Sequence, residues 1–304
     1  MHNAGPDPAD GYIGAMSNGQ DRDRVDRGEL FVVATPIGNL EDMSLRAIRI
    51  LREVDVIAAE DTRVTAHLLA RYAIAQRPLA LHAHNERART EQVLGLLAEN
   101  KRVALVSDAG TPGISDPGAI LVQAARAAGF RVTPIPGPSA LVAALSVAGI
   151  LVERMLFCGF LPAKASARRH AIAELAAGPE ALVFYEAPHR VIDCVCDLAA
   201  GLTRPGERRL VIAREITKLY ESVHESPLDQ AADWLRGDSD RQRGEFVLIV
   251  SGLESAEISA DWEHTLVVLL ADLPLAQAVR LTCAISGAKR KPVYDRALEL
   301  KDES

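Results

Sequence analysis

The chain has few cysteines, no long apolar run and no excess of positive charge. Its four cysteines, Cys158, Cys194, Cys196 and Cys283, are scattered, which suits a reducing cytoplasm. No segment approaches the ~18 consecutive apolar residues of a membrane span. The formal net charge of −7 argues against a general nucleic-acid-binding protein, which is normally basic. We therefore expect a cytoplasmic protein without a membrane span.

The signatures of several enzyme classes are also missing. The turn Ala34–Leu40 follows an apolar strand but lacks both the GxGxxG spacing and the Lys-Ser/Thr pair of a P-loop. A plain strand–helix connection and a binding loop both remain open there. No Ser-His-Asp, Cys-His or GxSxG pattern is present, which disfavours covalent catalysis. The pairs Cys194/Cys196 and His82/His84 lack further ligands at a recognised spacing, so no metal site is expected.

At 304 residues the chain is long for one compact domain, and two domains are expected. The first residues are polar and rich in Gly, Asp and Arg, which is typical of a disordered extension and not of a secretory signal. The predicted division is a disordered extension over 1–27, α/β domains over 28–150 and 151–253, and a small helical module over 265–304.

Strand-like and helix-like segments alternate from residue 29 to residue 252, which predicts mixed or parallel sheets with helices on their faces. Helices are expected from Ser44, over 63–72 and over 86–99. Pro274 and Pro292 should start the later helices of the tail. The predicted strands are 30–34, 55–59, 103–106, 131–135, 155–158, 182–185, 210–213 and 246–250.

The segment Ser107–Gly118, SDAGTPGISDPG, is the most informative part of the chain. It follows a buried strand and precedes a helix, and open α/β sheets bind ligands at such strand ends. Its glycines allow close approach of backbone to a ligand, and its aspartates can accept hydrogen bonds from an amine or a ribose. Asp108 is the better candidate for a ligand contact. Asp116, just before Pro117, is expected to cap the following helix.

Four further polar groups stand in predicted loops, three of them at the ends of predicted strands. Residues 60–63, EDTR, fit a helix cap with an ion pair or a substrate contact. Residues 82–86, HAHNE, gather hydrogen-bonding groups in one loop. Residues 185–190, YEAPHR, and 214–218, REITK, occupy equivalent ends in the second half, where a solvated loop is the alternative.

Eight motifs in order resemble the tetrapyrrole-methylase-like superfamily, and more narrowly its ribosomal RNA small subunit methyltransferase I branch. The resemblance runs from about residue 28 to residue 252, and the tail is similar to the small helical module that ends these enzymes. The motifs are VATPIGNLEDMSLRA, AAEDTR, HAHNE, SDAGTPGISDPG, PIPGPSA, FCGFLP, FYEAPHR and AREITKLYE.

The resemblance implies two α/β domains of the tetrapyrrole methylase type, with S-adenosylmethionine bound in a cleft between them. It also implies a homodimer that methylates the ribose 2′-hydroxyl of a cytidine in the decoding region of 16S ribosomal RNA in the small ribosomal subunit. Carried onto this sequence, the cofactor-binding residues are Pro36, Gly38, Asp108, Ala109, Gly110, Thr111, Pro112, Gly113, Ser139, Tyr185, Glu186, Ala213 and Gly244.

No covalent intermediate or metal is needed for such a transfer, but a positioned proton acceptor should help, by ~10²–10⁴-fold. The candidates are Glu60, Asp61, Glu186, His189 and Lys218, among which the sequence does not choose. Phosphate contacts are expected from basic residues, namely Arg63, Lys164, Arg168, Arg169 and Arg190. A small tetrapyrrole substrate, or a non-catalytic ribosome-associated protein that binds the cofactor, are the alternatives.

Overall fold

The structure is a computed structural model that describes residues 28–150, 154–176, 178–253 and 262–302. The predicted extension over 1–27 lies outside the described residues. The chain divides into two compact units. One contains the chain up to Ser146 together with Glu215–Glu221, and the other contains Val147–Arg214 with the chain from Ser222 onward.

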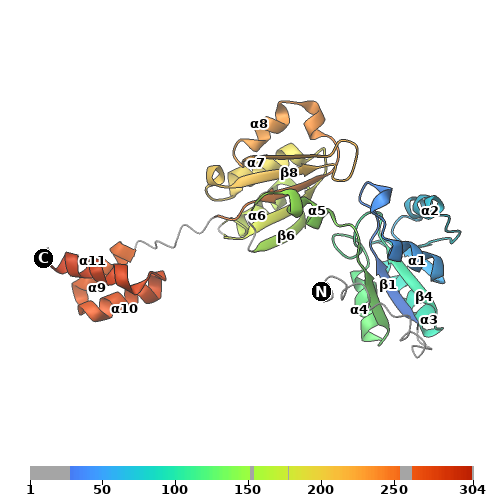
Figure 1. The fold of residues 1–304 in the computed structure, drawn as a ribbon, viewed down its shortest axis with the longest axis horizontal. Helices are drawn as coiled ribbons and strands as arrows, with labels where there is room; N and C mark the ends of the chain where they lie inside the picture. Colours follow the sequence, from blue (N-terminus) through green and yellow to red (C-terminus); the bar gives the residue numbers. More distant parts are fainter. Residues whose placement is uncertain (1–27, 151–153, 177, 254–261, 303–304) are drawn as a thin grey trace, which may run out of the picture. The chain divides into compact units, whose positions relative to one another are not determined.

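The first unit is a five-stranded parallel sheet in the order β3-β2-β4-β1-β5 (Figure 1). Each strand is followed by an α-helix before the next strand begins, as the alternating pattern predicted. The elements in chain order are β1 (Glu29–Val33), a 3-10 turn η1 (Leu40–Asp42), α1 (Leu45–Glu53), β2 (Val56–Ala59), α2 (Thr62–Arg71), β3 (Leu79–Ala80), α3 (Glu86–Ala98), β4 (Arg102–Val106), α4 (Ala119–Ala127), β5 (Arg131–Ile135) and α5 (Ala140–Val147).

Helices cover both faces of this sheet. Ala47 and Leu51 of α1 pack with Leu69 of α2 against one face. On the other face, Val93 of α3 and Leu121 of α4 share a core with the strands. Because both faces are buried, the central strands are continuous apolar runs instead of alternating ones.

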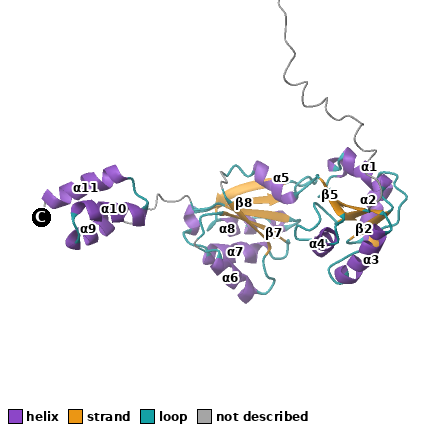
Figure 2. Ribbon diagram, turned by 90° about the horizontal axis from the view of Figure 1, so that it is seen from below, coloured by secondary structure: helices purple, strands orange, loops and turns teal. Residues whose placement is uncertain are grey.

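The second unit contains a mixed sheet in the order β6-β7-β10-β8-β9. Only β6 and β7 run parallel, and β10 pairs antiparallel with both of its neighbours. Helices α6, α7 and α8 pack against one face through a single core (Figure 2). The elements are β6 (Met155–Phe160), α6 (Ala165–Glu174), β7 (Ala181–Glu186), α7 (Val191–Gly201), η2 (Pro205–Glu207), β8 (Arg209–Arg214), β9 (Ser222–Pro227), α8 (Ala231–Arg236), η3 (Ser239–Gln242) and β10 (Phe246–Val250).

Three helices follow residue 261, namely α9 (Trp262–Asp272), α10 (Leu275–Ser286) and α11 (Arg290–Asp302). They share a small core of Leu266, Val279 and Val293. Pro274 caps the start of α10 and Pro292 lies in the first turn of α11, as predicted from their positions. Within the described residues, no helix combines the length and the apolar composition that crossing a bilayer requires.

These elements confirm the α/β class with two sheets and a helical tail. The polar strand β9 was not predicted, because its sequence SVHESP has no apolar run. It pairs antiparallel with β8 over six residues.

Candidate functional site

The strand order of the first sheet creates a switch point between β1 and β4. The connection from β1 leads through α1 to β2 on one side, and the connection from β4 leads through α4 to β5 on the other. In open α/β sheets, ligands bind at the carboxyl ends of the strands at such a point. The segment Ser107–Gly118 starts there, as does the turn that contains Pro36 and Gly38.

The two loops at the switch point are joined by backbone hydrogen bonds. The Thr35 N–H donates to the Gly110 carbonyl at 2.8 Å, and the Gly110 N–H donates to the Thr35 carbonyl at 3.0 Å. The buried Thr35 hydroxyl also donates to the carbonyl of Ser107 at 3.1 Å. Gly110 and Gly113 have φ near +80°, which favours glycine. The segment therefore has a defined shape at its start.

Asp108 ties this segment to the end of β2. Its Oδ1 accepts the Asp61 N–H at 2.9 Å. Asp61 caps α2 by accepting the Arg63 N–H at 2.8 Å, and the Arg63 guanidinium lies 2.7 Å from the Asp61 carboxylate. Hydrogen bonds from Arg63 hold the pKa of Asp61 well below its usual range. The predicted cap with an ion pair is thus confirmed.

Three carboxylates gather beside the joined loops. Burial, then the charge of Asp108, raises the pKa of Glu60. Burial, then the charge of Glu60, raises the pKa of Asp116 to about 6. These side chains are therefore close enough to repel one another, which a cationic ligand would relieve.

The prediction that Asp116 caps the following helix is wrong. The N-cap of α4 is Gly118, and the hydrogen bonds at this helix start go to the Glu86 carboxylate, from the Gly118 N–H at 2.9 Å and the Ile120 N–H at 3.0 Å. Asp116 instead faces Ser107, Glu60 and Asp108. The sequence offered no signal for this, because Glu86 lies 32 residues before Gly118.

Two further segments contact these loops within the first unit. The Thr111 hydroxyl donates to the Pro138 carbonyl at 3.2 Å, next to the half-buried Ser139. The segment Glu215–Glu221 lies over the first turn so closely that a Cβ on Gly38 would stand 2.4 Å from Cγ of Lys218. The Lys218 ammonium pairs with the Glu215 carboxylate at 2.9 Å.

The segment Glu215–Glu221 is backbone-strained. Glu215 and Thr217 both have positive φ, 52° and 69°. For a β-branched residue such as Thr217 this is an outlier that the surrounding contacts must hold, and such outliers cluster at functional sites. The Glu221 carboxylate accepts the Thr217 N–H at 2.5 Å and holds the turn.

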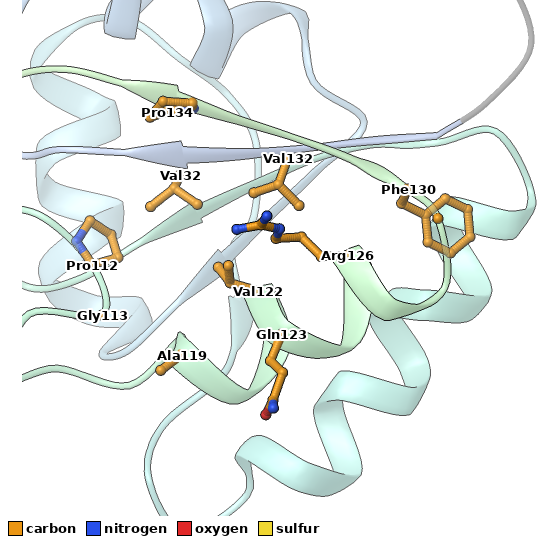
Figure 3. Close-up of a pocket in the computed structure, with 11 residues that line it drawn as sticks. Val32, Pro112, Gly113, Ala119, Val122, Gln123, Arg126, Phe130, Val132 and Pro134 are labelled. Atoms are coloured by element: carbon orange, nitrogen blue, oxygen red, sulfur yellow. The ribbon is translucent and has the colours of Figure 1, made fainter.

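An open cavity of about 1080 Å³ adjoins the far side of the segment (Figure 3). Val122 and Arg126 of α4 point toward the strands that carry Val32 and Val132 (Figure 3). Of the predicted cofactor residues only Pro112 and Gly113 line it, with Ala109 and Thr111 outside. Its lining is mostly apolar, with Gln123 and Arg126 as the polar side chains and no carboxylate to meet a cationic ligand.

The remaining predicted residues lie in the second unit. Tyr185 sits edge-on to the rings of Phe157 and Phe160, with centroids 5.0 and 5.7 Å away. Ala213 is buried within β8, and Gly244, with φ of 90°, precedes β10. Their predicted contact with a cofactor stays a prediction.

The Glu186 carboxylate is fully buried. It accepts the Ala187 N–H at 2.8 Å and lies 3.2 Å from the Arg190 guanidinium. Arg190 also donates to the Leu161 carbonyl at 2.5 Å, so it is held within the unit. His189, by contrast, is exposed. These contacts give Glu186 and Arg190 a part in shaping the turn after β7.

The predicted basic patch is divided between buried and exposed side chains. Arg168 is only 6 % exposed and pairs with Asp197 at 2.7 Å, so it offers little surface to a phosphate. Arg169 is 68 % exposed although it contacts the same carboxylate. Lys164 and Arg63 are also exposed.

Within the described residues, no group of three or more His, Cys, Asp or Glu side chains is arranged to hold a metal ion.

Comparison with known proteins gives two family matches. Residues 29–232 match the family of tetrapyrrole (corrin/porphyrin) methylases, and residues 256–301 match a domain described as the RsmI C-terminal HTH domain. Curated relatives named ribosomal RNA small subunit methyltransferase I align over most of the chain, and two of them serve as examples. The relative from Escherichia coli O157:H7 is 47 % identical over 90 % of this chain and 96 % of its own length. The relative from Xylella fastidiosa (strain Temecula1) is 50 % identical over 88 % and 98 %.

Solved structures show the same fold at low sequence identity. Uroporphyrin-III-C-methyltransferase from Thermus thermophilus aligns with a TM-score of 0.54 and 20 % identity, over 74 % of this chain and 94 % of that one. A conserved hypothetical protein from Aeropyrum pernix K1 aligns with a TM-score of 0.58 and 18 % identity, over 91 % and 98 %.

Proposed function

Because this chain belongs to the tetrapyrrole methylase family, and within it to ribosomal RNA small subunit methyltransferase I, we propose the following reaction. The protein transfers a methyl group from S-adenosylmethionine to the 2′-hydroxyl of a cytidine in the decoding region of 16S ribosomal RNA. The observation that carries the cofactor site is the pair of loops joined by Thr35 and Gly110 at the switch point, which leaves Asp108 and Ala109 exposed.

The residues present fit this cofactor by charge and by hydrogen bonding. S-adenosylmethionine carries a sulfonium and an ammonium group, and three neighbouring carboxylates favour a cation at the switch point. Asp108 and Ala109 are exposed, so their peptide groups and the Asp108 carboxylate can meet a ligand. When bound, the cofactor would supply a methyl group on sulfur that an oxygen nucleophile can take in line. The protein would mainly hold the two reactants in position, which contributes up to roughly 7–11 kcal/mol in favourable cases.

We propose Glu60 as the proton acceptor, with the exposed His189 as the alternative among the five candidates. Its pKa is raised by burial and by Asp108, which brings a carboxylate closer to the range that suits a base. Asp61 is held ionised by Arg63, and such a low pKa makes it a weak base. Glu186 is fully buried, and Lys218 is paired with Glu215.

Asp116 is a second carboxylate with a raised pKa, and it was not among the five proton acceptors expected from the sequence. Its raised pKa, about 6, also suits proton transfer near neutral pH.

The exposed Arg169 and Lys164 in the second unit would contact RNA phosphates, which position the substrate without specifying its sequence.

A labelling experiment tests the proposed function. Small ribosomal subunits that lack the modification are incubated with the protein and methyl-labelled S-adenosylmethionine, and the label is then mapped. We expect the label on the ribose of one cytidine in the decoding region. Label on a base would contradict the proposed reaction, and cofactor binding without transfer would indicate a non-catalytic protein.

A further inference from the structure

Glu86 holds the start of α4 from a distance. This residue begins α3 and is only 7 % exposed, and its Oε1 accepts two backbone N–H groups of the α4 start. A carboxylate at a helix N-terminus satisfies unpaired N–H groups and favours the positive end of the helix dipole. The contact therefore fixes the end of the segment Ser107–Gly118.

A capping side chain cannot be supplied locally. Ser, Thr, Asp or Asn usually caps a helix from the N-cap position itself. Here that position is Gly118, whose φ is +129°, and a Cβ on it would stand 2.7 Å from Cδ2 of Leu105 in β4. Both the positive φ and the contact with Leu105 disfavour a side chain at this position, and the acceptor that the structure provides comes from Glu86.

Hydrogen bonds within the turn of residues 82–86, HAHNE, position the Glu86 carboxylate that accepts these N–H groups. The Asn85 side chain accepts the His82 N–H at 2.8 Å, and the Asn85 N–H donates to the His82 carbonyl at 2.9 Å. The Asn85 amide also donates to the Ala80 carbonyl at 3.4 Å. These bonds fold the turn between β3 and α3 and place Glu86 at the first helical position. Helix α3 then packs beside α4 through Val93 and Leu121.

We propose that Glu86 is a positioning residue for the segment Ser107–Gly118, to which the proposed function assigns the cofactor. It acts through the start of α4. The opposite end of the segment is held by Thr35 and Asp61, so loss of the Glu86 contact frees only the end at residues 113–118. A segment that must become ordered on binding has a lower affinity than one already held in shape. This inference rests on the proposed function, because it needs S-adenosylmethionine as the ligand.

The test compares three variants by calorimetric binding of S-adenosylmethionine to the full chain, well below its unfolding temperature. Glu86→Ala should weaken cofactor binding roughly fivefold to tenfold, the size of a lost helix cap with charge-assisted hydrogen bonds. Glu86→Gln keeps the Oε1 acceptor and should restore most of the affinity. Glu91→Ala, an exposed glutamate on the same helix, should bind as the unaltered protein does.

Two further measurements separate positioning from a general loss of stability. In Glu86→Ala, the amides of residues 113–120 should exchange hydrogen faster than in Glu91→Ala, while those of β4 should keep their protection. In the methylation assay, KM for the cofactor should rise more than kcat falls.

Unchanged cofactor affinity in Glu86→Ala, with only a lowered Tm, would overturn this inference. Failure of the proposed function has a different result, since the unaltered protein would then fail to bind the cofactor or to label the RNA.

Discussion

Asp116→Asn should stabilise the first unit at neutral pH. The carboxyl has a pKa of about 6 in the folded chain against 3.8 for the ordinary group, first because of burial and then because of Glu60. This difference in pKa between the folded and unfolded states corresponds to at most about 3 kcal/mol of stability. The side chain is only half-buried, so screening by solvent reduces the expected effect to about 1 kcal/mol.

The direction in which the free energy of unfolding changes with pH depends on whether the folded or the unfolded state releases the proton first. The folded pKa is raised, so well below pH 3.8 both states are protonated and the group contributes no difference. Between pH 4 and 6 the unfolded chain loses its proton first, and the free energy of unfolding falls as the pH rises. Above about pH 6 the destabilisation is complete. The asparagine variant should therefore gain stability over this window and hold a constant gain above it.

Native-state hydrogen exchange of the β4 amides measures this effect in the first unit by itself. Asp116→Asn and the unaltered protein are compared at pH 4, 5, 6 and 7.5, where the intrinsic exchange rate cancels at each pH. The exposed Asp42→Asn, outside the carboxylate group, serves as the control. A gain that is the same at pH 4 and pH 7.5, or a loss of stability at pH 7.5, would refute the reasoning.

Three other substitutions separate roles that the sequence alone leaves mixed. Gly38→Ala should displace Thr217 and Lys218 and lower the stability of the unit by about 1–3 kcal/mol; thermal unfolding checks this against Gly95→Ala, where the added Cβ meets open space. Arg168→Ala should lower the free energy of unfolding by about 2 kcal/mol, less than for an isolated buried pair because Arg169 still contacts Asp197. Arg169→Ala should leave stability unchanged and reduce the slope of log affinity for the ribosomal subunit against log salt concentration by ~0.9, as measured by filter binding. An unchanged slope would show that Arg169 does not contact an RNA phosphate.

The strands and the loops that end them could be predicted from the sequence because the signal is local. A buried parallel strand is a continuous apolar run, and the polar residues that follow it mark its end. The run Val103–Val106 and the segment after it are the clearest example. Strand β9 escaped prediction for the same reason, since SVHESP is an exposed-edge sequence without an apolar run.

Side-chain partners across the fold could not be predicted. Arg168 stands in a basic stretch that reads as exposed surface, yet it is buried because Asp197, on the neighbouring helix, neutralises it. Arg208 shows the same limit, since it is fully buried and donates to the carbonyls of Thr203 and Ser251. Such pairings depend on how helices pack, which a one-dimensional pattern does not contain.

Four polar turns of the first unit all bond to the segment Ser107–Gly118. The turn after β1 bonds it through Thr35, the turn after β2 through Asp61, the turn after β3 through Glu86 and the turn after β5 through Pro138. A loop rich in glycine loses much conformational entropy when it is ordered. Four separate attachments hold the segment in shape, so under the proposed function each neighbouring turn should contribute to cofactor affinity even where its own side chain does not touch the cofactor.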